Sequence, residues 1–190
     1  MGTIVNTYLQ INPIQKLTLR TQFGANAHFR RTDKFTPEFY IDALEQSTLS
    51  NVSREMQEWL DWNWTNTATY ITTFAEKHNI NVMGGFTAER FAEFQSKASR
   101  DDVPNNMDQM QEVNAGTQNQ KSEGKTAYST LVSYLGRVMY NYDNRYYLTA
   151  SIRADGSSRF PKGNKYAIFP SVSASWRIIS ESFMQDQKIF

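Results

Sequence analysis

The sequence predicts an all-β fold: an antiparallel sheet of about seven strands that is not closed on its own. Three runs in the last third of the chain alternate between apolar and polar residues with a period of two, which places each set on one side of a strand. The apolar sets are rich in Tyr and Trp, and the connections between strands alternate between short and long. Together these observations are typical of a segment of a transmembrane β-barrel.

Seven segments alternate clearly enough to be predicted as strands. In 16–31, for example, Leu17, Phe23 and Phe29 share one side over a run longer than the usual soluble strand of about 5–6 residues. Strands of this length suit a barrel that projects beyond a bilayer. Trp62 and Trp64 are predicted to lie in an interfacial aromatic girdle. The predicted strands are 3–11, 16–31, 59–74, 80–94, 128–142, 146–153 and 166–178.

The predicted connections are unequal in length. They are short at 12–15, 76–79 and 143–144, long at 32–55 and 95–126, and intermediate at 155–165. Outer-membrane barrels have tight periplasmic turns at one rim and long external loops at the other, so we expect 32–55 and 95–126 to be external loops. Within the first of these, Thr36 as N-cap, Pro37 at the first helical position and the apolar spacing up to Leu44 predict a short helix.

Composition excludes several classes of function. The 190 residues carry a net charge of only +1, which gives no electrostatic case for a nucleic-acid partner. Cysteine is absent, so the chain has no disulfide, thiolate metal site or cysteine nucleophile. The sequence contains no run of about 18 or more apolar residues, so no transmembrane helix is predicted. No signal peptide is recognised. No nucleophile elbow appears, and we expect no enzyme, catalytic residue, cofactor or metal site.

Five residues are candidates for contact with a substrate. Phe35, Phe39 and Tyr40 lie in the first long connection, where rings can stack on sugars, although packing of the predicted loop helix is their more common use. Arg153 lies on the polar side of its strand, and Arg159 follows in the sequence D-G-S-S-R-F at 155–160. Charges on the wall of a wet barrel more often pair with neighbouring carboxylates than bind substrate.

Other polar residues favour structural roles. Arg137 and Arg177 are expected to form ion pairs on the polar side, like Arg153. The segment 155–160 lacks the spaced carboxylates of a calcium loop and the lysine of a P-loop, so we predict a strand-end turn capped by Asp155. His28 and His78 are too isolated to predict a metal site, and His78 is expected in a turn.

The C-terminal third also resembles a known family. The sequences Y-N-Y-D-N-R-Y-Y-L-T-A-S at 140–151, D-G-S-S-R-F at 155–160 and F-P-S-V-S-A-S-W-R-I at 169–178 are similar to the barrel of SusC/RagA-type TonB-linked outer-membrane proteins. The similarity is dense over about 50 residues and weaker elsewhere. Ala154 departs from the polar residue that the family usually has before D-G-S-S-R-F.

The resemblance implies a Gram-negative outer-membrane location, in Bacteroidota, and energy-coupled import of oligosaccharides or peptides. It also implies a SusD-like surface lipoprotein over the external loops, the TonB complex acting through a plug region, and contact with outer-membrane lipid. No plug or TonB box is recognised in these residues, and the strands are fewer than the roughly 22 of closed transporter barrels, so we expect an internal piece of the barrel.

Two alternatives stay open from the sequence. One is a passive porin-like barrel, which an upstream plug would exclude. The other is a soluble carbohydrate-binding β-sandwich, in which a second sheet would cover the apolar side. Burial distinguishes that sandwich from a membrane barrel: in the sandwich, the second sheet would cover Tyr134, Tyr140, Leu148, Val172 and Trp176.

Overall fold

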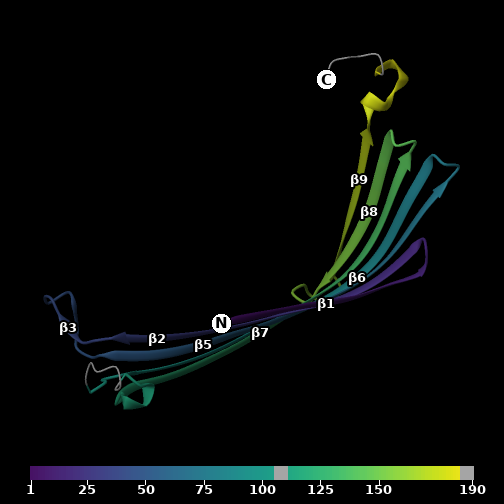
Figure 1. Cartoon of the computed structure of the whole chain (residues 1–190). Helices are drawn as coiled ribbons and strands as arrows, with labels where there is room; N and C mark the ends of the chain where they lie inside the picture. Colours follow the sequence, from purple (N-terminus) through teal and green to yellow (C-terminus); the bar gives the residue numbers. More distant parts are fainter. Residues whose placement is uncertain (105–110, 185–190) are drawn as a thin grey trace. The chain divides into compact units, whose positions relative to one another are not determined.

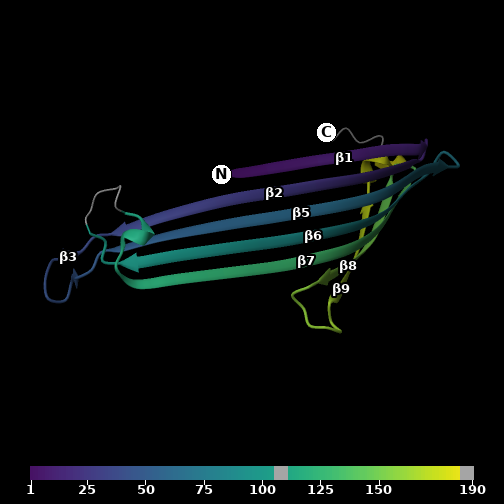
Figure 2. The same ribbon diagram turned by 90° about the horizontal axis from the view of Figure 1, so that it is seen from below.

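The structure, a computed structural model, describes residues 1–104 and 111–184. A seven-stranded antiparallel sheet has the order β1-β2-β5-β6-β7-β8-β9, so every long strand lies beside the next long strand of the sequence (Figure 1, Figure 2). This arrangement confirms the predicted fold class. The strands are β1 (Gly2–Ile14), β2 (Leu17–Thr36), β5 (Asn51–Phe74), β6 (His78–Asp101), β7 (Gln118–Tyr142), β8 (Tyr146–Ser157) and β9 (Tyr166–Trp176).

The residues form two compact units. Several strands contribute residues to both. Unit 1 comprises Met1–Ile4, Asn26–Asp61 and Phe91–Tyr128, and unit 2 comprises Val5–Ala25, Trp62–Arg90 and Ser129–Phe190.

The long strands extend beyond their predicted ends. β2 and β5 leave a connection of 37–50 instead of 32–55, and β6 and β7 leave 102–117 instead of 95–126. In unit 1 charged side chains occupy many strand positions; Arg54 and Asp33, for example, form an ion pair at 2.6 Å. The alternation in hydrophobicity fades there, although the strands continue. The turn predicted at 12–15 is also wrong, because β1 runs to Ile14. β1 is an edge strand, where Pro13 is tolerated.

The helix predicted near 36–44 is wrong as well. β3 (Phe39–Tyr40) and β4 (Gln46–Ser47) form a two-stranded hairpin there. Asp42 Oδ1 accepts hydrogen bonds from the backbone nitrogens of Leu44 and Glu45, both at 2.8 Å, and such local bonding competes with helix formation. The helical turns of the described residues are of the 3-10 type, at η2 (Val113–Ala115), η3 (Ile178–Ser180) and η4 (Ser182–Met184). Within these residues, no helix has the length and apolar character needed to cross a membrane.

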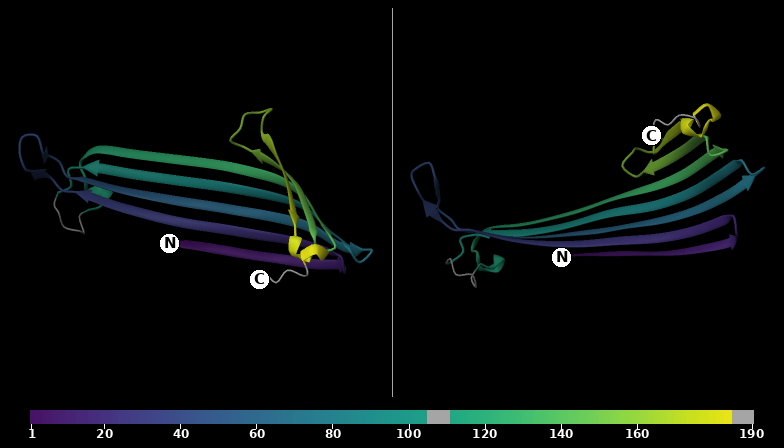
Figure 3. Two further views of the ribbon diagram at one scale, coloured as in Figure 1. Left: turned by 90° about the horizontal axis from the view of Figure 1, so that it is seen from above. Right: turned by 45° about the horizontal axis from the view of Figure 1, so that its top comes forward.

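In unit 2 the turns 15–16, 75–77 and 143–145 lie at neighbouring strand ends (Figure 3). Asp143 and Asn144 have φ angles of 50° and 53°, as in two-residue type I′ hairpins, which follow the twist of antiparallel strands. The Asp143 nitrogen donates to the Lys77 carbonyl at 2.8 Å and links two of these turns. This end of unit 2 is called the short-turn end.

In unit 1 hydrogen bonds fasten the roots of the connections 37–50 and 102–117 to each other. The Ser50 hydroxyl accepts from the Val103 nitrogen at 2.8 Å and donates to the Val103 carbonyl at 3.2 Å. The Asp102 nitrogen donates to the Ser50 carbonyl at 2.8 Å, and the Asn51 amide donates to Asp101 at 2.6 Å. We call these four bonds the root staple.

The sheet has almost no protein core. Among the described residues, the buried apolar side chains are Val52, Ala92 and Val103, and no large side chain is fully buried. A soluble domain normally buries the apolar face of its sheet against a second layer. Here the backbone ladder and cross-strand side-chain pairs hold the strands together, and the described residues supply no second layer of this kind.

Candidate functional site

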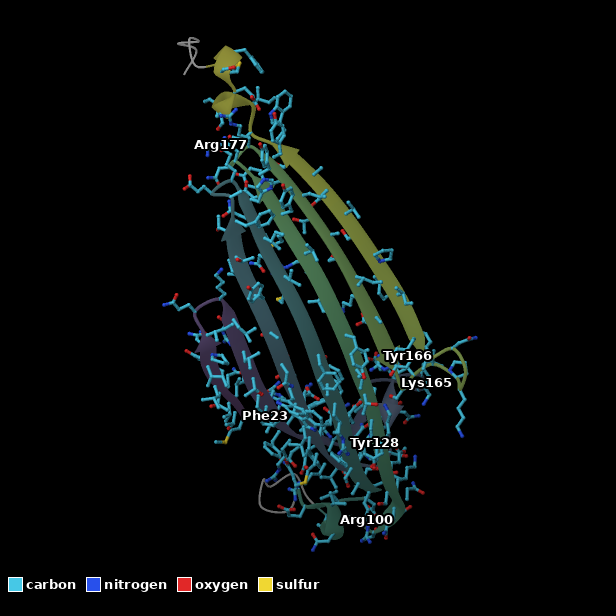
Figure 4. The ribbon with its side chains drawn as sticks, turned by 90° about the vertical axis from the view of Figure 1, so that its right-hand side faces the viewer. Phe23, Arg100, Tyr128, Lys165, Tyr166 and Arg177 are labelled. Carbon is cyan, nitrogen blue, oxygen red and sulfur yellow. The ribbon has the colours of Figure 1, made fainter. Side chains whose placement is uncertain are left out.

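The three C-terminal strands present a continuous apolar surface in unit 2. The register places Val138, Ala150 and Val172 side by side, and residues paired in this way project to the same side of an antiparallel sheet. Tyr166 and Arg177 mark the two ends of β9 (Figure 4). We call this surface the apolar face; it comprises Tyr134, Val138, Tyr140, Leu148, Ala150, Ile152, Ile168, Val172, Ala174 and Trp176.

No protein layer covers the apolar face within the described residues. Val172 is 73% exposed and Trp176 50% exposed; Tyr134 and Leu148 are also exposed, and Tyr140 is half-buried. The only other sheet formed by these residues is the small β3–β4 hairpin. The burial that a soluble β-sandwich requires is therefore not found, and the exposure is what the lipid-facing wall of a barrel needs.

Aromatic rings form a row at the short-turn end of unit 2. Phe74 stacks on His78 with a centroid distance of 4.7 Å, His78 lies 4.9 Å from Tyr142, and Tyr146 lies 6.2 Å from Tyr142 and 6.3 Å from Trp176. We call these five residues the aromatic rim; they come from five consecutive strands of the sheet. His78 is the first residue of β6 and not a turn residue as predicted. Amphipathic rings of this kind favour a membrane interface.

A second group of rings, on β2, β5, β6 and β7, lies farther along the strands from the short turns. Phe23 stacks on Trp62 at 6.3 Å, and Phe86 lies between Trp64 and Tyr134 at 6.2 and 5.4 Å. Tyr134 and the rim residue Tyr142 are eight positions apart on β7, about 26 Å at roughly 3.3 Å per residue. With a tilt of about 35–45°, this corresponds to about 20 Å across a bilayer, close to the apolar band of roughly 25 Å in outer-membrane barrels.

Two predicted substrate residues, Arg153 and Arg159, have partners within unit 2. Arg153 pairs with Asp155 at 2.7 Å and donates to Ser133, which is 4% exposed. Arg159 donates to the buried Ser129 hydroxyl at 3.2 Å. Both arginines thus bind hydroxyls of β7, four positions apart. These contacts hold both arginine side chains against β7.

The turn at 157–160 is capped by serines rather than by Asp155. Ser157 Oγ accepts from the Arg159 nitrogen at 3.2 Å, and Ser158 Oγ accepts from the Thr130 nitrogen at 2.8 Å. Gly156 has a separate role: a Cβ there would meet the Tyr166 ring at about 2.5 Å, so glycine lets this ring lie flat over β8. The D-G-S-S-R-F sequence is accordingly used for packing and capping.

The expected ion pair is not found at Arg137. Its Nη2 lies 3.7 Å from the Met83 sulfur, and its buried Nε has no hydrogen-bond partner. Arg177 forms no carboxylate pair among the described residues, and its backbone nitrogen donates to the Arg145 carbonyl at 2.7 Å. Within the same residues, no cluster of His, Cys, Asp and Glu is suited to hold a metal ion.

The aromatic candidates of the first connection lie in unit 1. Phe35 is half-buried near the end of β2, whereas Phe39 and Tyr40 form the exposed strand β3, with Tyr40 72% exposed. The helix that they were expected to pack does not form. Phe39 and Tyr40 are consecutive, so they project to opposite sides of the hairpin. Arg153 and Arg159 belong to unit 2, so the structure groups the five candidates into two sets.

Two polar features of the structure were not anticipated from the sequence. Glu181 accepts from the Tyr146 hydroxyl at 2.6 Å, from the Trp176 indole at 3.0 Å and from Arg145 at 3.3 Å. The bond from Tyr146, followed by that from Trp176, keeps the pKa of Glu181 below its ordinary value. The second feature is a hollow in unit 1 lined by three lysines from three strands. Its members are far apart in sequence, and only the register of the sheet brings them together.

Taken together, a meander of long antiparallel strands, an uncovered apolar face and flanking aromatic rows define a wall segment of an outer-membrane-type β-barrel. Comparison with known proteins narrows this class. The chain is 28% identical over 185 residues to TonB-dependent receptor P26 of Formosa agariphila, covering 96% of this chain and 19% of the relative. It is 46% identical over 72 residues to TonB-dependent receptor SusC of Bacteroides thetaiotaomicron, covering 36% and 7%.

The fold agrees with these relatives. The solved structure of the RagAB peptide transporter matches with a TM-score of 0.85 at 27% identity, covering 97% of this chain and 20% of that chain. No protein-family model matches the chain. The chain spans about a fifth of the length of P26 and of the RagAB chain. The resemblance to SusC/RagA-type TonB-dependent receptors is thus confirmed in sequence and fold, and these relatives carry the names of receptors and transporters, not of enzymes.

Proposed function

We propose that the chain forms part of the barrel wall of an outer-membrane TonB-dependent transporter that imports oligosaccharides or peptides. The observation that carries this proposal is the exposed apolar face, bounded by the aromatic rim, in a chain similar over 96% of its length to a TonB-dependent receptor. In hydrocarbon, the ladder satisfies the backbone and the apolar side chains contact acyl chains. The polar side then borders the lumen or its plug.

The same proposal assigns the two rims and the partners. The connections 37–50 and 102–117, inside the predicted external loops 32–55 and 95–126, lie outside the cell beneath a SusD-like lipoprotein, and the short turns lie in the periplasm. The TonB complex acts through the plug of the transporter. Support comes from the unequal connection lengths and from the names of the similar proteins, which include a peptide transporter.

Cysteine labelling tests the orientation of the wall. These 190 residues contain no cysteine, so Val172→Cys, Ser171→Cys and Lys162→Cys each introduce a single thiol into them, and the protein without these substitutions gives the labelling background. In outer membranes we expect a membrane-impermeant maleimide to label Lys162→Cys, and only a lipid-soluble maleimide to label Val172→Cys. Ser171→Cys, next to Val172 but on the other side of β9, controls for reactivity of the strand. Rapid labelling of Val172→Cys by the impermeant reagent would contradict the lipid-facing assignment.

Uptake tests the transport itself. Deletion of the gene should abolish uptake of a labelled oligosaccharide or peptide pool by intact cells, and deletion of TonB should do the same. Uptake that requires the gene but not TonB would instead favour the porin-like alternative.

A further inference from the structure

Three lysines converge on one hollow of unit 1. Lys34 comes from β2, Lys97 from β6 and Lys121 from β7, and with β5 these strands are consecutive in the sheet (Figure 2). The hollow has a volume of about 300 Å³. Its remaining lining consists of polar side chains and one carboxylate, from Asn51, Ser53, Ser99 and Glu123. We call this set of seven residues the lysine hollow.

The lining carries two more positive than negative charges. Among the described residues, none of the three lysines forms an ion pair within 4.0 Å. Some other cations of the same unit are paired: Arg54 contacts Asp33 at 2.6 Å and Glu112 at 3.0 Å. Ion pairs thus form at Arg31, Arg54 and Lys125 of this unit but at none of the three lysines of the hollow.

A further carboxylate, Asp101, interacts electrostatically with Lys121. Asp101 also accepts from the Asn51 amide at 2.6 Å and from the Asn119 amide at 2.8 Å. Of these two amides, that of Asn51 belongs to the lining of the hollow. Glu123 is the one carboxylate of the lining, and it offsets one lysine charge.

The spacing suits a small anion with several oxygens. Neighbouring strands are about 4.8 Å apart, so the backbone at Lys97 is roughly 5 Å from β7 and roughly 10 Å from β2. Flexible lysine stems reach across such distances, and ammonium groups that outnumber the carboxylates of the lining repel one another. An oxyanion removes this repulsion and accepts hydrogen bonds from the ammonium groups and from the Ser53 and Ser99 hydroxyls.

We infer that the lysine hollow is a binding site for a carboxylate, sulfate or phosphate group of a soluble ligand. The site follows from three lysines, none of which forms an ion pair within 4.0 Å among the described residues, lining one cavity together with hydroxyl donors. Only the statement that the bound group belongs to an imported substrate rests on the proposed function. The ligand class is then an acidic or ester-charged oligosaccharide or peptide.

Binding to the protein as encoded, purified in detergent from outer membranes, tests the inference. The probes are fluorescein-labelled dextran sulfate, polygalacturonate and neutral dextran of matched length, followed by fluorescence anisotropy; the first two distinguish sulfate from carboxylate. The triple variant Lys34→Gln, Lys97→Gln, Lys121→Gln should bind the preferred anionic probe at least about tenfold more weakly, and Glu123→Gln should bind it more tightly. Neutral dextran should bind much more weakly than either.

A matched control removes three lysines from the turns and loop of unit 2, as Lys77→Gln, Lys162→Gln, Lys165→Gln. It should retain the affinity of the unaltered protein. Equal weakening in both triple variants, a loss of affinity in Glu123→Gln, or no binding of either anionic probe would overturn the site.

The binding measurement needs no TonB and no energy source, so its result is separate from the transport assay. A protein that binds the anionic probes but imports nothing would refute the proposed transport function and leave the site standing. A protein that imports neutral glycans and binds no anionic probe would do the reverse.

Discussion

Replacing Val172 by arginine should destabilise the membrane-inserted protein by about 2–4 kcal/mol, the cost of this side chain at the middle of a barrel's lipid face. The register places Val172 in line with Ala150 and Val138. Val138 lies four positions from Tyr134 and four from Tyr142, about 13 Å along the strand from each aromatic row. The substituted guanidinium would therefore sit as far as possible from both interfaces.

The assay is a urea titration of the purified protein folded in phosphatidylcholine vesicles. A loss of 2–4 kcal/mol lowers the folding equilibrium constant by roughly 30-fold to 700-fold. With a slope of about 2 kcal/mol per molar urea, the midpoint should fall by roughly 1–2 M.

Ser173→Arg is the matched control, because it introduces the same side chain one position away on the other side of β9. In the proposed orientation position 173 faces away from lipid, so we expect a cost below about 0.5 kcal/mol. Equal costs for the two variants, or a larger cost for Ser173→Arg, would refute the assignment of the apolar face to lipid.

Three further predictions use the same titration. Gly24→Ala should cost about 1–3 kcal/mol, because a Cβ there overlaps the Asn63 side chain, whereas Gly84→Ala, whose Cβ meets no atom within 4 Å, should be neutral or slightly stabilising. The hydrogen bond from the Tyr146 hydroxyl lowers the pKa of Glu181 in the folded protein. The ionised Glu181 carboxylate therefore stabilises the fold above about pH 4.5, and this stabilisation should be lost as the pH falls through the lower pKa of the folded state. Glu181→Gln should remove this pH dependence. Tyr140→Phe deletes a 2.7 Å hydrogen bond to His78 Nδ1 and should cost about 1 kcal/mol.

The sequence was most informative where one side of a strand is apolar. The alternation around Val138, Leu148 and Val172 predicted the strands and which residues share a side, because successive residues of a strand project to opposite sides of the sheet. The same signal fades in unit 1, where pairs such as Arg54 and Asp33 occupy the strands. The ladder continues there without a hydrophobic pattern, which explains why the predicted strands ended too early.

Local signals failed where a side chain competed for the backbone. Pro37 indicated a helix start, but the bonds from Asp42 to two backbone nitrogens favour a hairpin turn. The lysine hollow was missed for a different reason. Lys34, Lys97 and Lys121 are unremarkable in sequence, and their proximity depends on a register that composition does not encode.

The root staple also bears on how force passes through unit 1. Ser50 and Val103 are joined by two hydrogen bonds through one buried hydroxyl, and two more bonds flank them. A load applied to the connection 37–50 is therefore shared at its base with the connection 102–117. A partner bound to one of these connections is therefore also coupled to the base of the other. Separating the two bases requires breaking all four hydrogen bonds of the root staple. We therefore expect the bases of the two connections to respond to an applied load as one mechanical unit.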